Sequence, residues 1–174
     1  GPVHINVPFR EPLLIDFCDL PKLRYECNIL NDYSLSDGAK NVLQNVITET
    51  RKGIFIVGEL ALNTDVDHVW ALIRRAKWPV IVESLSNMRG NIPEDCLPYV
   101  ISTYDAILKN AAFKKAVAPT TVIRFGAQPV SKFLSNFIAE SNPENYIIVD
   151  EDPMFRDSTS MATSFIHAKL DQSL

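Results

Sequence analysis

The sequence has no cluster of glycines of the kind that cradles a phosphate. Its six glycines are scattered along the chain, and neither a Gly-x-Gly-x-x-Gly fingerprint nor a Walker sequence occurs. Gly58 and Gly126 each follow an apolar run, but a single glycine per turn indicates a tight turn and not a nucleotide cradle. We therefore expect that FAD, NAD and ADP do not bind tightly to this chain.

Cysteine and basic charge are also scarce. The three cysteines are odd in number and widely spaced, which predicts reduced thiols in the cytoplasm and neither a disulfide framework nor a metal site. None of the three histidines has a neighbour at metal-ligand spacing. The net charge of −4 predicts no surface for nucleic acid, and no apolar run approaches the length of a membrane span.

What the sequence does contain is an alternation of short apolar runs with stretches of helical spacing. Its 174 residues, of which 47% are apolar, suit one domain with a sizeable core. The predicted strands span residues 54–57, 79–82, 121–125, 146–149 and 164–167. The predicted helices begin at Ser34 and Thr64, and two more span residues 104–110 and 130–140, with a long loop over 84–98. This alternation predicts a doubly wound, mostly parallel α/β sheet with helices on both faces.

The helices carry predicted caps and buried faces. Ser34 has Asp37 three residues later, as in a capping box, and Pro129 suits the first position of the last helix. Arg74, Arg75 and Lys77 near the end of the second helix are interpreted as a solvated cluster that complements the helix dipole. The expected buried residues are Leu35, Ala39, Val42, Leu43, Val46 and Ile47, then Val66, Val69, Trp70 and Ile73, and finally Val130, Leu134, Phe137 and Ile138.

The opening residues predict the last strand of a preceding domain. Val3, Ile5 and Val7 alternate with polar residues, and two prolines then interrupt any ladder. We therefore interpret the chain as a fragment. The expected organisation is an interdomain segment over residues 1–30, an α/β middle domain over 31–168 and the start of a further linker over 169–174.

Four runs resemble the SEPHCHC synthases, a family of thiamine-diphosphate enzymes of menaquinone biosynthesis (SEPHCHC is 2-succinyl-5-enolpyruvyl-6-hydroxy-3-cyclohexene-1-carboxylate). The runs are Gly1-Pro-Val-His-Ile-Asn-Val-Pro-Phe-Arg-Glu-Pro-Leu13, Arg124-Phe-Gly-Ala-Gln-Pro-Val-Ser-Lys132, Tyr146-Ile-Ile-Val-Asp150 and Arg156-Asp157. The resemblance covers nearly the whole chain but only the central portion of such an enzyme. The middle domain of another thiamine carboligase, such as an acetolactate synthase, fits the predicted fold but not residues 6–13.

The resemblance implies a Rossmann-like middle domain of an enzyme that decarboxylates 2-oxoglutarate on thiamine diphosphate, with Mg or Mn, and adds the product to isochorismate. It implies that the whole enzyme is a cytoplasmic homo-oligomer. It also implies that the cofactor-binding glutamate and Gly-Asp-Gly segment belong to the first and third domains. No Gly-Asp-Gly occurs in this chain. We therefore expect the chain alone to contain no catalytic, cofactor-binding or metal-binding residue and to be inactive.

Lys132 is the principal candidate for a substrate-binding residue. It follows a strand in the first turn of a predicted helix, where a cation opposes the helix dipole, and it is outside the apolar stripe. A solvated surface lysine is the ordinary interpretation, but the resemblance implies that this lysine reaches the carboxylates of the substrates. Arg89, in a loop after a strand, and Gln128, in the same motif as Lys132, are further candidates for substrate binding.

Two other polar groups follow or interrupt predicted strands. Arg124 lies inside an apolar strand and would need a partner if it is buried. Asp150-Glu-Asp152 is interpreted as a solvated acidic loop, since no glycine fingerprint accompanies it. An alternative function for the whole chain is a regulatory module that senses a small anion at the edge of the sheet.

Overall fold

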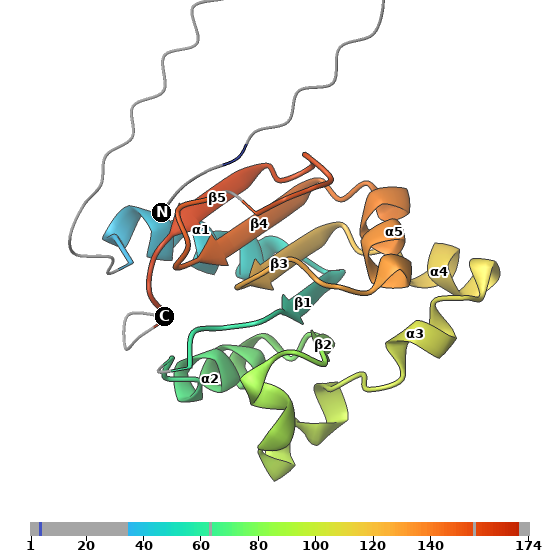
Figure 1. Cartoon of the computed structure of the whole chain (residues 1–174), viewed down its shortest axis with the longest axis horizontal. Helices are drawn as coiled ribbons and strands as arrows, with labels where there is room; N and C mark the ends of the chain where they lie inside the picture. Colours follow the sequence, from blue (N-terminus) through green and yellow to red (C-terminus); the bar gives the residue numbers. More distant parts are fainter. Residues whose placement is uncertain (1–3, 5–34, 63, 155, 171–174) are drawn as a thin grey trace, which may run out of the picture. The chain divides into compact units, whose positions relative to one another are not determined.

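The computed structural model describes residues 4, 35–62, 64–154 and 156–170 (Figure 1). They contain five parallel strands in the order β2 (Val80–Val82), β1 (Gly53–Val57), β3 (Thr121–Phe125), β4 (Asn145–Asp150) and β5 (Ser164–His167). The predicted α/β fold is confirmed, and every strand pair is parallel. Two strands, β3 and β5, match the predicted bounds, and the others differ by one residue at one or both ends.

Helices cover both faces of the sheet. Buried residues of α1 (Asp37–Glu49) and α2 (Asp67–Ala76) belong to one apolar cluster, whereas those of α3 (Tyr104–Ile107) and α5 (Lys132–Ser141) belong to another. In Figure 1, α3, α5 and α4 (Ala111–Val117) lie together at the opposite side of the drawing from α1. Two 3₁₀ helices, Asn87–Gly90 and Glu94–Tyr99, occupy most of the predicted loop over 84–98.

The two clusters arise from the alternation of side chains along buried strands. In β1, Phe55 and Val57 face the α1–α2 side, and Ile54 and Ile56 face the α3–α5 side. All five residues of β1 are buried, as expected of a parallel strand covered on both faces. The first residue of this strand, Gly53, has no room for a side chain, because a Cβ there would lie 2.3 Å from the Trp78 ring.

Three of the predicted helix starts are wrong, by two or three residues. The N-cap of α1 is Ser36, whose hydroxyl accepts from Ala39 N at 3.2 Å, and not Ser34. The N-cap of α2 is Val66, without a side-chain cap, and not Thr64. The N-cap of α5 is Ser131, so Pro129 precedes the helix. In each case more than one residue near the true start could have been chosen as the first residue or the cap of the helix.

The predicted buried faces need two corrections, and one helix was missed. Val42 of α1 is 45% exposed, and Val130, which precedes α5, is 65% exposed. The predicted helix over 104–110 ends at Ile107, and α4 follows as a separate helix that the apolar pattern did not reveal. Arg74 is not merely solvated, since its Nε donates to Asp95 Oδ2 at 2.5 Å.

The connection between β4 and β5 contains no helix within its described residues, 151–154 and 156–163. Parallel strands usually need a helix to cross over a sheet face. Here the face is covered by a segment of turns, which we call the strap (residues 151–163). Met161 and Ala162 of the strap pack against the α3–α5 cluster, so the strap takes the place of a crossover helix.

The chain divides into two units, Gly1–Leu30 and Asn31–Leu174, and all elements above belong to the second. Apart from residue 4, the predicted strand over residues 3–7 lies outside the described residues, as do Ser34, Cys18 and Cys27. Among the helices that the structure describes, none is long and apolar enough to span a membrane.

Candidate functional site

The carboxyl ends of the strands form the edge at which an open α/β sheet binds ligands. The winding reverses at β1, which lies between β2 and β3. Gly58 and Gly126 lead into the loops after β1 and β3. A Cβ on Gly58 would lie 2.0 Å from the Ala127 carbonyl oxygen, and Gly126 has a φ of +73°. Both glycines therefore allow the chain's own loops to pack closely, which is the structural role that the sequence indicated.

The start of α5 is held at this edge by a buried glutamate. Glu83 follows β2 directly and is 1% exposed. One of its carboxylate oxygens accepts from the Ser131 backbone N–H at 3.1 Å, and the other accepts from the Ser84 backbone N–H at 3.1 Å. The carboxylate thus fixes the residue that caps α5, and Lys132 comes next.

Asp105 fixes the same cap from α3. Its carboxylate accepts a hydrogen bond from the Ser131 hydroxyl, which in turn accepts from Leu134 N at 3.2 Å. Burial raises the pKa of the neighbouring Tyr104 phenol, and the charges of Glu83 and Asp105 raise it further. The sequence analysis missed both carboxylates. A glutamate directly after an apolar strand was the available signal for Glu83, but nothing in the local sequence relates Asp105 to Ser131.

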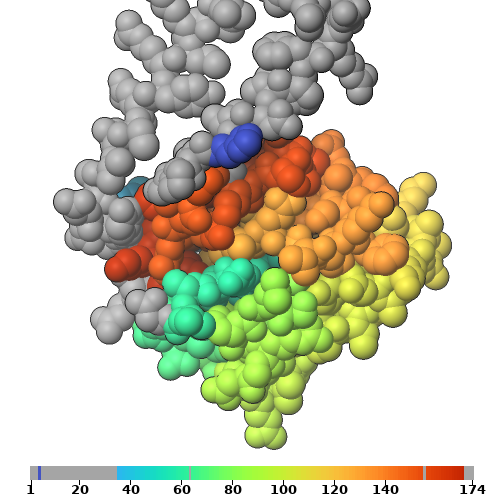
Figure 2. All heavy atoms as spheres, in the orientation of Figure 1, coloured from blue at the N-terminus to red at the C-terminus, as the bar shows by residue number. Residues whose placement is uncertain are grey.

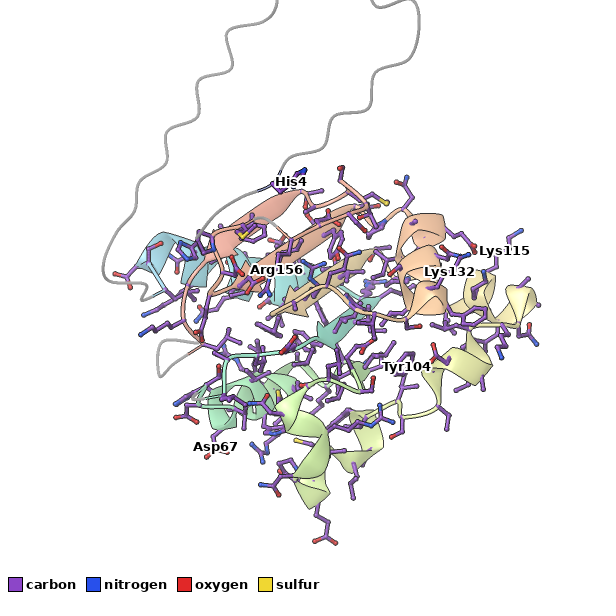
Figure 3. All side chains as sticks on the ribbon, in the orientation of Figure 1. His4, Asp67, Tyr104, Lys115, Lys132 and Arg156 are labelled. Carbon is purple, nitrogen blue, oxygen red and sulfur yellow. The ribbon has the colours of Figure 1, made fainter. Side chains whose placement is uncertain are left out.

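Lys132 is the first helical residue of α5, and the first turn contains no acidic residue. Its side chain is exposed and makes no hydrogen bond or ion pair with any residue in the described ranges. Figure 3 shows it at the end of α5 nearer to Tyr104. A cation in this position opposes the helix dipole at a cost of about 0.3–1 kcal/mol. Lys132 is therefore an unpaired cation on a rigidly held helix start.

Arg89 lies at the same corner of the sheet. It belongs to the 3₁₀ helix after β2, is exposed, and donates from Nη1 to the Val82 carbonyl oxygen at 3.4 Å. Val82 directly precedes Glu83, so Arg89 and Lys132 are both anchored beside this carboxylate. The positive charge of Arg89 also opposes the rise in the pKa of Tyr104. The structure thus brings together two of the three residues predicted to bind substrate.

Gln128 has a different environment. Its side-chain oxygen accepts from the Ser158 backbone N–H at 2.8 Å, and its amide nitrogen donates to the Ser158 hydroxyl. Both ends of the amide are therefore engaged by the strap. Its predicted contact with substrate stays a prediction, and the contacts seen here hold the loop after β3 against the strap.

Arg124 has hydrogen-bond partners, as expected of a charged residue buried inside a strand. It is fully buried, donates from Nη1 to the Tyr146 hydroxyl at 3.0 Å, and donates from Nη2 to the Arg156 carbonyl oxygen in the strap. Its Nε has no partner among the described residues. The guanidinium therefore joins β3, β4 and the strap through neutral oxygens.

The interpretation of Asp150-Glu-Asp152 as a solvated loop is wrong for Asp150. This residue is 2% exposed, and its carboxylate accepts from Arg156 Nε at 3.0 Å and from Nη2 at 2.7 Å. The charge-assisted pair raises the pKa of the Arg156 guanidinium. Asp150 closes the end of β4 and fixes the beginning of the strap.

A hollow of about 370 Å³ lies beside this pair, between the loops after β1, β3 and β4. The carboxylates of Glu59, Asp150, Glu151 and Asp152 line it, and its arginine, Arg156, is already paired. Such a lining repels phosphates. This hollow is therefore unsuited to the phosphates of FAD, NAD or ADP, and the wider expectation that they do not bind tightly stays a prediction. Within the described ranges, no group of three or more histidine, cysteine or acidic side chains could hold a metal ion.

The family model for the middle domain of thiamine pyrophosphate (TPP) enzymes matches residues 38–174, which include the whole sheet and the start of α5. The chain therefore belongs to this family of middle domains.

Relatives of known name point to one enzyme within that family. The chain is 56% identical over 175 residues to the 2-succinyl-5-enolpyruvyl-6-hydroxy-3-cyclohexene-1-carboxylate synthase of Lysinibacillus sphaericus, and the match covers the whole of this chain. It is 36% identical to the enzyme of that name from Bacillus velezensis and 32% identical to that from Listeria welshimeri, over 96% of the chain in both cases. The chain spans 31%, 29% and 29% of the lengths of these three relatives.

Proposed function

We propose that this chain is the middle domain of an SEPHCHC synthase. The whole enzyme would decarboxylate 2-oxoglutarate and add the resulting four-carbon unit to isochorismate. Thiamine diphosphate, with Mg or Mn, supplies the chemistry of decarboxylation and carbon–carbon bond formation. In this proposal the cofactor and metal are held by the first and third domains of the same chain, and the enzyme is a cytoplasmic homo-oligomer. The 56% identity, over the whole of this chain, to a synthase of that name supports it.

The proposed role of this domain is to present Lys132 to a substrate carboxylate. The single observation that carries the role is an exposed, unpaired ammonium directly after a capping residue that two carboxylates fix in place. Both proposed substrates are carboxylates, which an ammonium binds through charge-assisted hydrogen bonds. Arg89, anchored beside the same glutamate, would add a second positive charge to the approach.

Steady-state kinetics of the full-length enzyme test this role. Lys132→Ala should lower kcat/KM for one of the two substrates about 10- to 100-fold, because one charge-assisted hydrogen bond is worth about 1.5–3 kcal/mol. Lys132→Arg should retain part of the activity. Lys115→Ala removes an exposed lysine of α4 and provides a control that should leave kcat/KM unchanged. The melting temperature of Lys132→Ala should hardly change, because the side chain is exposed and makes no hydrogen bond or ion pair with any residue in the described ranges.

The opposite pattern would show that Lys132 is a structural residue. Unchanged kcat/KM for both substrates, together with a clearly lowered melting temperature, would remove it from the substrate site. A failure of the full-length enzyme to consume 2-oxoglutarate with isochorismate would overturn the assignment of the enzyme itself.

A further inference from the structure

A second cavity lies where β1 and β2 begin, at the edge of the sheet opposite to Lys132. Its volume is about 440 Å³, which is within the range of small-molecule sites. Gly53, Ile54 and Trp78 line it from the start of the two strands, and Leu108 and Phe137 line it from the helical side. Most of the lining is therefore apolar, and the cavity is separate from the proposed substrate site.

The helix α4 provides one wall of this cavity but buries none of its own residues. Phe113 and Val117 both line the cavity, and they are 42% and 43% exposed. Figure 2 shows the segment of α4, in yellow, at the rim of the molecule. An amphipathic helix normally buries its apolar side against neighbours. Here that side faces open space, so a ligand in the cavity would supply the contacts that α4 lacks.

The position of α4 is fixed by polar contacts instead. The Asn110 side chain caps it by accepting from Phe113 N at 3.0 Å, and Lys114 forms an ion pair with Glu140 of α5. The wall is therefore in place before any ligand arrives, which lowers the entropic cost of binding.

Three cations stand at the mouth of the cavity. Arg51 and Lys52 precede β1, and Lys77 ends α2 just before β2. Their side chains are exposed and make no ion pair with any residue in the described ranges. No acidic residue contributes to the lining. An apolar interior beneath unpaired cations is complementary to a molecule with an apolar body and an anionic head.

We propose that this cavity binds a small amphiphile with an apolar body and a single anionic head. The apolar body lies against Trp78, Phe113 and Val117, and the head contacts Lys77 and its two cationic neighbours. This site is independent of the carboligase assignment, because binding needs only residues of this chain and no cofactor.

Decanoate is the probe in the 174-residue chain, and the readouts are the melting temperature and the tryptophan emission, to which Trp78 in the cavity and Trp70 outside it both contribute. Decanoate should change the tryptophan emission saturably and raise the melting temperature, whereas decyltrimethylammonium, which has a cationic head, should do neither. Decanol should bind at least about tenfold more weakly than decanoate, because it lacks the charge. Equal binding of all three probes, or no saturable binding of decanoate, would overturn the proposal.

Two substitutions locate the site. Val117→Trp fills the cavity and should abolish decanoate binding, and Lys77→Glu places a negative charge at the mouth and should weaken binding about tenfold or more. Lys115→Glu makes the same charge change on α4 outside the cavity lining and should have little effect. If Lys77→Glu and Lys115→Glu weaken binding equally, the decanoate is bound elsewhere and the site is wrong. Lys77 is a surface residue, so this comparison holds even if Val117→Trp fails to fold.

Discussion

Glu83 shows how a single buried residue can fix the backbone next to Lys132, the residue proposed to bind substrate. Its two oxygens accept from the backbone N–H groups of Ser131 and Ser84, so Glu83→Ala leaves both donors without this partner. We expect the free energy of unfolding to fall by about 1–3 kcal/mol. In the full-length enzyme, KM for the substrate proposed to bind Lys132 should rise more than kcat falls, and Glu83→Gln should restore part of the loss.

The control for this prediction is Glu144→Ala, which removes an exposed glutamate before β4. It should leave both stability and KM unchanged. A Glu83→Ala enzyme that loses stability but keeps the KM of the parent would make Glu83 a structural residue without influence on Lys132.

Asp157 gives the strap a dependence on pH. Burial alone would raise the pKa of this carboxyl, but hydrogen bonds from the Thr159 hydroxyl and from the backbone of Thr159, Met161 and Ala162 outweigh it and hold the pKa below its usual 3.8. A depressed pKa stabilises the fold above the unfolded pKa, and this contribution is lost as the pH falls through the folded pKa.

Denaturant unfolding between about pH 5 and pH 3 checks this sign. The parent should lose stability with falling pH more steeply than Asp157→Asn, which cannot titrate. Glu144→Gln, at an exposed position, should follow the parent. Parallel curves for the parent and Asp157→Asn would show that Asp157 contributes nothing to acid sensitivity.

At the scale of elements, the strap replaces a helix with a polar network. The Arg156 guanidinium donates to the buried Asp150 of β4, and its backbone carbonyl oxygen accepts from Arg124 of β3. One residue thus connects the strap to both strands. Arg156→Ala would leave the Asp150 carboxylate buried without its cation. Because Arg156 is partly exposed, we expect a loss of about 2 kcal/mol and not the larger cost of breaking a fully buried pair.

Hydrogen exchange locates the effect of Arg156→Ala. The amides of β5 and of residues 160–163 should exchange faster, because the strap leads directly into β5. The amides of β1 should stay protected. Arg74→Ala breaks the exposed pair with Asp95 and should change exchange only near that pair. Uniform acceleration across the whole sheet would mean that the strap does not unfold as a separate unit.

The sequence predicted the strands better than the helices, for a physical reason. A strand buried on both faces, such as residues 54–57, is a continuous apolar run whose ends are sharp. A helix start depends on which of several nearby polar residues accepts the first N–H, and Ser36 and Ser131 were chosen by packing that a linear pattern does not show. The helix α4 was missed because its apolar residues are not buried.

The same distinction holds for the candidate site. The position of Lys132 at the carboxyl edge followed from the strand-to-helix order, because parallel strands place all their carboxyl ends together. The partners of Ser131 did not follow, since Glu83 and Asp105 are 48 and 26 residues away along the chain. Side-chain contacts across such distances depend on the fold, which the sequence pattern defines only at the level of topology.

At the scale of the whole molecule, the sheet separates two sites. Lys77 precedes β2 and Glu83 follows it, so the cavity mouth and the anchor of Lys132 lie at opposite edges. From Pro79 to Glu83 an extended strand covers about 13 Å, which exceeds the Debye length of about 8 Å at physiological ionic strength. Charge changes at one edge should therefore be largely screened from the other.

The last prediction uses this separation. Lys132→Ala should leave decanoate affinity unchanged within about twofold, because distant sites without shared partners behave additively. Lys77→Glu should likewise leave kcat/KM of the full-length enzyme unchanged. Tyr104 connects the two regions, since it lines the cavity and the charge of Glu83 raises its pKa. If Lys132→Ala weakens decanoate binding, and Tyr104→Phe removes that dependence, the two sites are coupled through α3 and the sheet does not isolate them.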